Sequence, residues 1–405
     1  MRARRIILLC SALLAAGALA AGTASASGLR VHLHAKYLVI PARGASTAQS
    51  LAESAAAQTV PLWSGSATAF GSNYNYTMVG VNPFVKETTP SVTITTNVVP
   101  IKIELLNSTG GVVQSFNPNA ANTACGLTTS PDARTRQSPL FAPYNDTVDG
   151  TNIGKVQYES GFMRENFANY VLGSGAINPK YGITLKAVNT PEFTVTVPST
   201  DWSMYYASSY GQCGGNAAGN MPSINYTYWD TYVQGTLIPL LQADGYTTST
   251  NMVDLLLANV VMYDGTVSNC CILGYHSGVA TASGEQYYDT ADYDSTGLFT
   301  YNGAVTDDIS AMSHELGEWL NDPNGNNPVP AWGHIGQQPG CQTNLEVGDP
   351  LSGTTVSIAM SNGVTYHPQE LVFLSWFYRQ VPSIGLAGWY SSNGTFKTDA
   401  GPVCS

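Results

Sequence analysis

Hydrophobic and polar positions follow two different periods along this chain. Residues 91–106, SVTITTNVVPIKIELL, carry β-branched residues in partial alternation with polar ones, which predicts a strand. Pro100 within this run indicates an edge strand or a bend, because proline donates no ladder hydrogen bond. GVVQS (111–115) and EFTVTVPS (192–199) predict further strands. We therefore expect residues 61–200 to form a β-rich part.

Helical spacing of apolar residues appears later. Within residues 155–173, Phe162, Phe167 and Val171 recur at helical steps before a glycine, and a second helical pattern covers residues 225–245. The run VDLLLANVVMYDG (253–265) predicts a buried strand that ends in a turn. Because strands come first and mixed elements follow, the expected fold class is α+β. The mixed part is residues 201–405, unless 61–405 form one continuous domain.

The N-terminus has the pattern of an export signal. An arginine-rich start precedes an apolar run over residues 6–21, and small residues follow at 24–26. The apolar run is short for a membrane span. We expect residues 1–26 to be a cleaved signal peptide and the mature chain to be secreted, with no membrane span. Residues 27–60 are expected to be a flexible lead-in or a propeptide.

Charge and composition exclude one class of partner. The formal net charge is −11, and loss of the signal would remove three arginines and no acid. An acidic surface does not suit sequence-independent binding to nucleic acid. Only 11% of the residues are charged, whereas glycine (40 residues) and tyrosine (23 residues) are abundant. This composition is typical of an exported, loop-rich β protein.

The cysteines outside the signal are even in number, which favours disulfides in an exported protein. Their pairing stays open, and they are Cys125, Cys213, Cys270, Cys271, Cys341 and Cys404. The adjacent Cys270 and Cys271 are expected to bond to different partners, because neighbouring cysteines join only with backbone strain. No C-x-x-C spacing supports a thiolate metal cluster.

The segment AMSHELGEWLNDP (311–323) predicts a helix with unusual chemistry. Thr306 or Asp307 is the expected N-cap, and Pro323 is expected to end the helix. Apolar residues at three- and four-residue steps form one face for burial, and these are Ile309, Met312, Leu316, Trp319 and Leu320.

His314 and Glu318 are four residues apart, so they share a helix face with Cβ atoms about 5–6 Å apart. This spacing allows both side chains to bind one metal ion. Glu315 lies one step round the helix, where the glutamate of H-E-x-x-H zinc peptidases acts as general base. The third ligand is to be sought among His334, Glu346 and Asp349, with Glu346 favoured by analogy with sites of two histidines and one glutamate.

The ligand set bears on the metal and its chemistry. Zn²⁺ is the expected ion, although one imidazole and two carboxylates are a hard set that could admit manganese, iron or calcium. Extra negative charge makes a metal-bound water less acidic. Glu318 in place of a second histidine therefore permits metal binding and leaves turnover open.

Three segments resemble a known family. SHELGEWLNDP (313–323), NLEVGDPL (344–351) and NGVTYHPQELVFLSWF (362–377) are similar to secreted, zincin-like H-E-x-x-E proteins, the phosphate-induced, EXORDIUM-like family and its bacterial relatives. CCILGYHSG (270–278) resembles a cysteine-rich segment that precedes the helix in that family. The resemblance covers about residues 255–377.

The resemblance implies a zincin-like metal site in residues 201–405. His314, Glu318 and Glu346 match the ligand positions of the family, Glu315 matches its base, and Asp349 matches an acid behind the ligands. Pro350 departs from the family pattern, as does the position of Cys341. The family is linked to cell-wall growth in plants.

Two functions follow as hypotheses. The first is a secreted zinc metallopeptidase, in which the metal carries a water and polarises the scissile carbonyl, and Glu315 takes the proton of the water. Its substrate would be a peptide or a cell-wall component. The alternative is a non-catalytic wall- or glycan-associated protein with a structural or vestigial metal, to which His334 or Asp349 would add a fourth ligand. His276 is expected to be structural, and a glycosidase that uses Glu315 and Glu318 ranks last.

Overall fold

The computed structural model describes residues 36–39, 59–206, 221–301, 304–305, 307–333, 341–401 and 404. The expected signal peptide, most of the expected lead-in, Cys213 and His334 lie outside these residues. In the described part of the chain, no helix is long and apolar enough to cross a membrane.

One mixed sheet organises the described residues. It contains eleven strands, and its main path runs β10-β11-β13-β14-β15-β12-β4-β5, with β1 on β14 and with β8 and β9 on β4. The bounds are β1 Lys36–Val39, β4 Ser91–Leu106, β5 Val112–Phe116, β8 Gly182–Asn189, β9 Phe193–Val197, β10 Trp202–Tyr206, β11 Met221–Asn225, β12 Met252–Ala258, β13 Val261–Tyr263, β14 Cys270–Thr281 and β15 Gly284–Tyr293.

Short hairpins and helices surround this sheet, so the α+β class is confirmed. The hairpins are β2 Leu62–Ala69 with β3 Ser72–Val79, β6 Tyr144–Val148 with β7 Thr151–Val156, β16 Thr300–Tyr301 with β17 Ala304–Val305, β18 Pro328–Gly333 with β19 Cys341–Asn344, and β20 Ile358–Ala359 with β21 Thr365–Tyr366. The α-helices are α2 Pro131–Gln137, α3 Tyr158–Asn166, α4 Ala168–Val171, α5 Tyr226–Tyr232, α6 Ile238–Ala243, α7 Ser310–Asn321 and α8 Leu374–Phe377. Single turns are η1 Thr123–Cys125, the π-helical η3 Val233–Leu237, η4 Val267–Asn269, η5 Asp349–Leu351 and η6 Leu386–Gly388.

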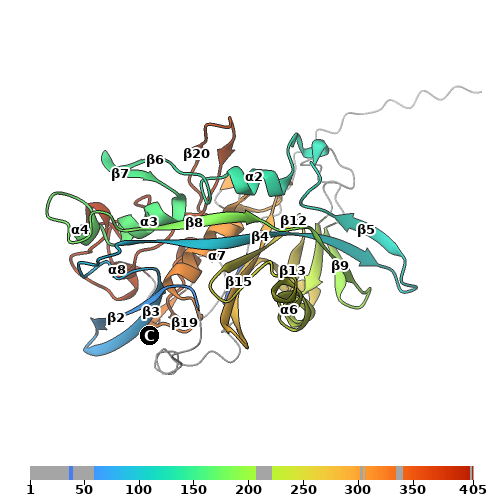
Figure 1. Ribbon diagram of the computed structural model, residues 1–405, viewed down its shortest axis with the longest axis horizontal. Coiled ribbons are helices and arrows are strands. Elements are labelled where there is room, and N and C mark those ends of the chain that lie inside the picture. The colour runs from blue at the N-terminus through green and yellow to red at the C-terminus, as the bar shows by residue number, and fades with distance from the viewer. Residues whose placement is uncertain are drawn as a thin grey trace, which may run out of the picture. The chain divides into compact units, whose positions relative to one another are not determined.

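The predicted strand at residues 91–106 is confirmed as β4, which crosses the molecule beside β8 (Figure 1). The expectation that Pro100 marks an edge or a bend is corrected in one respect, because β4 has partners on both sides. Its neighbours change at this point: β8 and β12 pair with the first part of β4, and β9 and β5 pair with the second. The missing N–H of Pro100 therefore falls where the ladders change over.

Alternation along β12 assigns its side chains to two faces of the sheet. Met252 and Leu256 belong to the core that α3 and α7 share, whereas Val253, Leu255 and Leu257 belong to a second core with α5, η3 and α6. The sheet is thus covered on both faces, and β12 is buried throughout, as expected of the apolar run in which it lies. Strands from both sides of residue 200 share this sheet.

The lead-in contributes one strand to the sheet. β1 pairs in parallel with β14, from Lys36 opposite Ile272 to Val39 opposite His276. The segment expected to be a flexible lead-in or a propeptide therefore includes four residues that lie along β14.

Two disulfides join described cysteines. Cys341 bonds to Cys404, and Cys270 bonds to Cys271. The second bond corrects the expectation of different partners for the adjacent pair. A cis peptide bond lies between these two residues, with their Cα atoms 3.1 Å apart instead of the 3.8 Å of a trans peptide, and both side chains reach each other. Cys125 is also in a disulfide.

The predicted motif helix is confirmed as α7, Ser310–Asn321, and it ends before Pro323 as expected. Its start is a correction, because the N-cap is Ile309 and makes no side-chain cap. The backbone of Asp308 has φ 44°, which an α-helix does not accommodate, so the helix begins after it. Every residue of α7 is buried, the polar face included. That face lies against β14 and β15.

We expect Gly317→Ala to lower the free energy of unfolding by about 1–3 kcal/mol, the usual cost of overpacking a core. A Cβ atom on Gly317 would lie 2.4 Å from Cδ1 of Leu371 and 3.2 Å from Oε2 of Glu159. The matched control is Gly235→Ala, because no atom lies within 4 Å of its added Cβ. Urea denaturation of both variants checks this, and equal stability for the two would contradict the packing described.

Candidate metal centre

The imidazole of His314 is held by Gln369 from the segment before α8. The Gln369 amide donates from Nε2 to the Gly348 carbonyl (2.7 Å), and its Oε1 accepts from Gly353 N (3.2 Å). These bonds orient Oε1 toward His314, so Nδ1 of His314 donates to it at 3.1 Å. In the neutral imidazole, Nε2 then carries the lone pair. An acceptor that holds one ring nitrogen in this way is typical of metal-binding histidines.

His314 forms a first group with Glu318 and Asp349, whose ligand atoms all lie within 4.8 Å of one another. His314 Nε2 is 2.9 Å from Glu318 Oε1 and 3.6 Å from Asp349 Oδ1. Two atoms that bind one zinc ion at 2.0–2.2 Å in tetrahedral geometry lie about 3.3–3.6 Å apart. The separation from Asp349 lies in this range, whereas that from Glu318 is a hydrogen-bond distance, so the group could hold a metal ion after a small outward shift of Glu318.

Glu318 also belongs to a second group, with His276 and Glu346. His276 is on β14, and its Nδ1 lies 3.7 Å from Glu318 Oε2. Glu346 follows β19, and its Oε1 accepts from Asn344 Nδ2 at 2.9 Å. Oε2 of Glu318 and Oε2 of Glu346 are buried and accept from no N–H or hydroxyl group of a described residue.

His276 has its own fixed orientation. Its Nε2 lies 3.1 Å from the carbonyl oxygen of Asp322, which can only accept, so Nε2 carries the proton. Nδ1 of the neutral ring therefore presents a lone pair to Glu315 Oε2 at 3.2 Å and to Glu318 Oε2 at 3.7 Å. A proton or a cation is needed between these atoms.

Glu315 lies on the sheet side of α7. Its Oε2 faces His276, and its Oε1 receives no hydrogen bond within the described part of the chain. A Cβ atom on Gly274 would lie 2.7 Å from that Oε1, so this glycine provides room for the carboxylate. Burial, and then the charges of Glu318, Asp289 and Asp349, raise the pKa of Glu315 well above its ordinary value.

The acidic cluster continues across the sheet. Asp289 on β15 is opposite His276, and Asp254 on β12 is opposite Asp289, so all three face α7. Burial raises the pKa of Asp254 to about 8. Burial and then the charge of Asp254 raise the pKa of Asp289 well above its ordinary value. Burial thus favours the protonated form of both carboxyls.

The imidazole of His314 and the carboxylates around it shift each other's pKa values toward the charged forms. Burial opposes ionisation of Glu318, but the imidazole of His314 outweighs it and lowers the pKa of Glu318. Burial alone would lower the pKa of His314, but the carboxylates of Glu318 and Asp349 raise it. Burial, and then the charge of Glu318, raise the pKa of Glu346 well above its ordinary value. A cation would therefore compete with protons for these ligands.

The structure brings together the residues singled out from the sequence, but in two sets. His314 and Glu318 share a group with Asp349, whereas Glu346 shares a group with Glu318 and His276. Asp349 was one of the open third ligands, and it lies in the first group. Two contributors were not assigned to the site from the sequence: His276, expected to be structural, and Gln369. The sequence signal that could have indicated His276 is its position in an apolar strand that precedes the motif helix.

Asp307, Asp308 and His367 form a third candidate metal group near the start of α7, and their side chains already make ion pairs with one another. His367 Nδ1 lies 3.0 Å from Asp307 Oδ1 and 3.0 Å from Asp308 Oδ2. Hydrogen bonds to Asp307 and then to Asp308 raise the pKa of His367 to about 10. About a third of the imidazole is exposed, so we assign this group a structural role.

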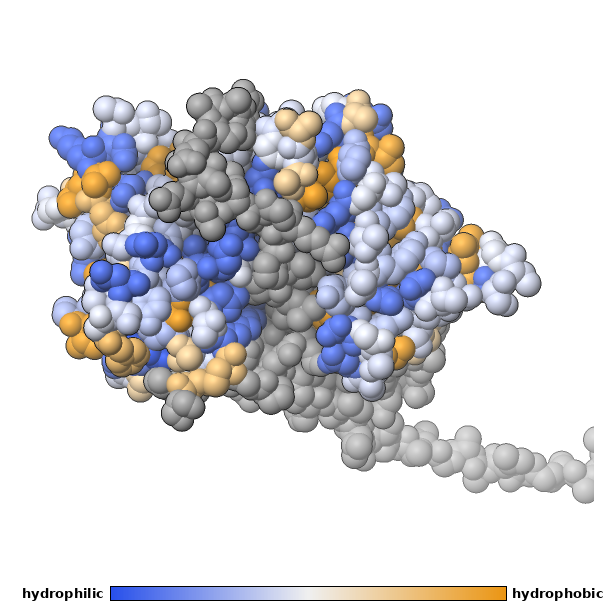
Figure 2. Space-filling model, turned by 90° about the horizontal axis from the view of Figure 1, so that it is seen from below, coloured by the Kyte–Doolittle hydropathy of each residue, from blue (hydrophilic) through white to orange (hydrophobic). Residues whose placement is uncertain are grey.

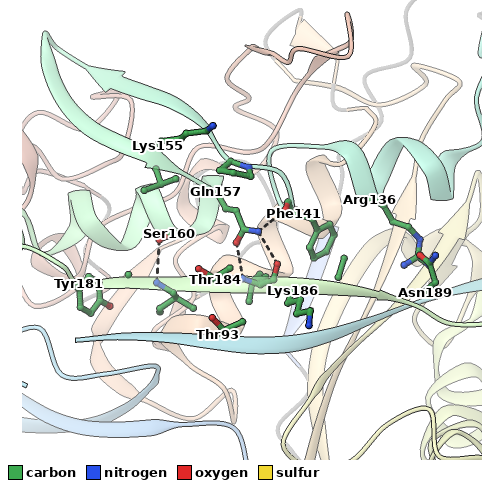
Figure 3. Close-up of a pocket in the computed structure, with 16 residues that line it drawn as sticks. Thr93, Arg136, Phe141, Lys155, Gln157, Ser160, Tyr181, Thr184, Lys186 and Asn189 are labelled. Atoms are coloured by element: carbon green, nitrogen blue, oxygen red, sulfur yellow. Dashed lines mark hydrogen bonds between the residues drawn. The ribbon is translucent and has the colours of Figure 1, made fainter. Parts of the chain in front are cut away.

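A pocket of about 660 Å³ lies apart from these groups, along the edge of β8 (Figure 3). Gln157 reaches from the start of α3 to this edge, where its amide exchanges two hydrogen bonds of 2.8 Å with the backbone of Leu185. Ser160 Oγ accepts from Ile183 N at 3.3 Å. These side chains form hydrogen bonds with the backbone groups at the edge of β8, as a neighbouring strand would. The described lining of the pocket includes no member of the metal groups.

The side chains of the two candidate metal groups around Glu318 are all buried, at 0–2% exposure. On the face seen in Figure 2, apolar residues lie in small separate groups among hydrophilic ones.

A scan against protein-family models and searches of curated proteins and of solved structures found no match. The function is therefore inferred from the side chains of the centre.

We expect Gln369→Leu to lower the affinity for a bound divalent metal by about 10–100-fold, the usual cost of losing a residue that orients a ligand. The substitution removes the acceptor of His314 Nδ1–H. The control Gln137→Leu changes an exposed glutamine and should leave the affinity unchanged. Competition with a chromophoric chelator measures the affinity, and an unchanged value in Gln369→Leu would contradict the orienting role.

The His367 ion pair predicts a pH dependence of stability. Its folded-state pKa of about 10 exceeds the ordinary 6.5, so its stabilisation is complete below about pH 6.5 and is lost as the pH rises to about 10. The difference in free energy of unfolding between the wild type and His367→Gln should shrink over this window. Urea denaturation at pH 6, 8 and 10 measures it, and a difference that stays constant would refute the assignment.

Proposed function

We propose that this protein is an exported, zincin-like metal-dependent hydrolase that cleaves peptide bonds. The observation that carries the proposal is the arrangement on α7. His314 and Glu318 present a nitrogen and an oxygen 2.9 Å apart, and Glu315 lies beside them with one carboxylate oxygen that no described donor contacts. A metal-binding pair and an adjacent base are the parts that hydrolysis of an amide requires.

His314, Glu318 and Asp349 would hold the metal, with Gln369 orienting the imidazole. A divalent cation bound there supplies a Lewis acid that polarises a carbonyl and lowers the pKa of a water molecule. Glu315 would accept the proton of the attacking water at Oε1 and deliver it to the leaving amine. Burial raises the pKa of Glu315, which makes this carboxylate a stronger base than an exposed glutamate.

The edge of β14 supports a peptide as the substrate. Residues 272–276 pair with β1, and the far end of this pairing is His276 itself. An extended segment can therefore add to the sheet beside the metal groups, which is a common mode of peptide recognition. β1 comes from the expected lead-in, so this part of the chain would occupy the position of a substrate until it is displaced or removed.

The alternative, a non-catalytic protein with a structural metal, has one observation in its favour. Asp349 joins His314 and Glu318, and every side chain of the groups is buried. A closed site with four protein ligands stabilises a fold without turnover. In that case the wall- or glycan-associated hypothesis would describe the protein better.

The test is metal content and peptide hydrolysis in one set of variants. Glu315→Gln is expected to keep the metal and to lose at least about 10²-fold in hydrolysis of a quenched fluorescent peptide library. His314→Ala is expected to lose hydrolysis together with the metal ion held by His314, Glu318 and Asp349. Glu192→Gln, an exposed glutamate, is the matched control and should change neither. Elemental mass spectrometry of the purified chains gives the metal content.

Other outcomes decide between the two functions. Metal in the wild type together with no hydrolysis of any peptide, and with thermal stability that falls when the metal is removed, would favour the structural site. Loss of metal in Glu315→Gln would show that Glu315 is a ligand and not the base.

A further inference from the structure

We propose that the centre binds two divalent cations and that Glu318 bridges them. The first cation is the one already assigned to His314, Glu318 and Asp349, so the inference rests on the proposed function for that half. The second is held by His276, Glu318 and Glu346. No single group accounts for both sets of converging ligands.

The carboxylate of Glu318 faces in two directions. Its Oε1 lies 2.9 Å from His314 Nε2 on the same helix, and its Oε2 lies 3.7 Å from His276 Nδ1 on β14. Gly348 N donates to Oε1 at 3.1 Å and so helps to fix the plane of the carboxylate. Each oxygen is directed at a different imidazole, which is the geometry of a bridging carboxylate.

Both imidazoles are held in the tautomer that suits a ligand. The proton of His314 is on Nδ1, toward Gln369, and the proton of His276 is on Nε2, toward the Asp322 carbonyl. The other nitrogen of each ring faces carboxylate oxygens, and in each group either a proton or a cation lies between nitrogen and oxygen. A divalent cation can take the place of the proton in both groups.

The two terminal carboxylates are supported in the same way from one strand. On β19, Gln342 Nε2 donates to Asp349 Oδ2 at 2.8 Å, and Asn344 Nδ2 donates to Glu346 Oε1 at 2.9 Å. Two residues apart on a strand, these amides point to the same side. The other oxygen of Asp349 lies 3.6 Å from His314 Nε2, within the first group, and Glu346 belongs to the second group.

Glu346 is the strongest single indication of a second cation. Its Oε2 is fully buried, and neither it nor Glu318 Oε2 accepts from an N–H or from a hydroxyl group of a described residue; the two carboxyl groups meet each other instead. Burying a carboxylate oxygen without a partner is costly, and a cation shared by the two oxygens would satisfy both.

Charge and ligand type indicate the class of ion. The carboxyl groups of Glu315, Glu318, Glu346 and Asp349 lie around the two imidazoles, and such a set of oxygen ligands favours divalent over monovalent cations. Each group offers one imidazole nitrogen and carboxylate oxygens, a set that suits Zn²⁺, Mn²⁺ or Fe²⁺ better than thiophilic ions.

The test counts metal ions in the full chain. The protein is stripped with a chelator, dialysed against Zn²⁺ or Mn²⁺ and analysed by elemental mass spectrometry. We expect two ions per chain in the wild type. One ion should remain in His276→Ala and in Glu346→Gln, and one in Asp349→Asn. His367→Gln, a histidine outside both groups, should keep two. Circular dichroism of each variant establishes that it is folded, and Glu346→Gln preserves the shape of the site if His276→Ala does not fold.

Electron paramagnetic resonance of the Mn²⁺-loaded protein adds a readout of the bridge. Two ions joined by Glu318 should give an exchange-coupled spectrum, and Glu318→Gln should abolish the coupling. One ion per chain in the wild type, unaffected by His276→Ala and Glu346→Gln, would overturn the second cation and leave the proposed function intact. No ion in any folded chain would overturn both. Two ions with uncoupled spectra would overturn the bridge.

Discussion

The buried carboxylate of Glu318 between two imidazoles is the interaction on which the rest of this structure depends. A carboxylate inside a protein is tolerated when donors or cations surround it. His314 contacts one of its oxygens and His276 approaches the other. β14 and α7 hold His276, His314 and Glu318 close together in the buried interior.

Three separate parts of the chain meet at this carboxylate. The sheet provides His276 from β14, and α7 provides His314, Glu315 and Glu318 from one helical turn and its neighbour. The loop after β19 provides Glu346 and Asp349, each oriented by an amide of that strand. Glycines at two contacts make the approach possible: a Cβ atom on Gly348 would lie 2.5 Å from the His314 ring, and one on Gly274 would lie 2.7 Å from Glu315.

The candidate metal groups are buried, and they lie next to the edge of β14 that pairs with β1. Burial raises the pKa of Glu315 and would strengthen the attraction between the carboxylates and any bound cation, because charges interact more strongly where water is excluded. The edge of β14 that ends at His276 is where β1 pairs. Residues of the lead-in and residues of the metal groups are therefore neighbours in the sheet, although more than 200 residues separate them in sequence.

The sequence by itself determined the local elements and the pairing of His314 with Glu318. Alternation predicted β4, the apolar run predicted β12, and helical spacing predicted α7, because each depends on neighbours a few residues away. The four-residue spacing of His314 and Glu318 likewise predicted their contact. The tertiary structure alone decided that Asp349 joins this pair, that Glu346 joins His276, and that Gln369 orients His314. It also decided that Cys270 bonds to Cys271 and that Pro100 lies inside the sheet. These outcomes depend on which strand pairs with which and on how loops return to the helix, and such long-range pairing has no period in the sequence.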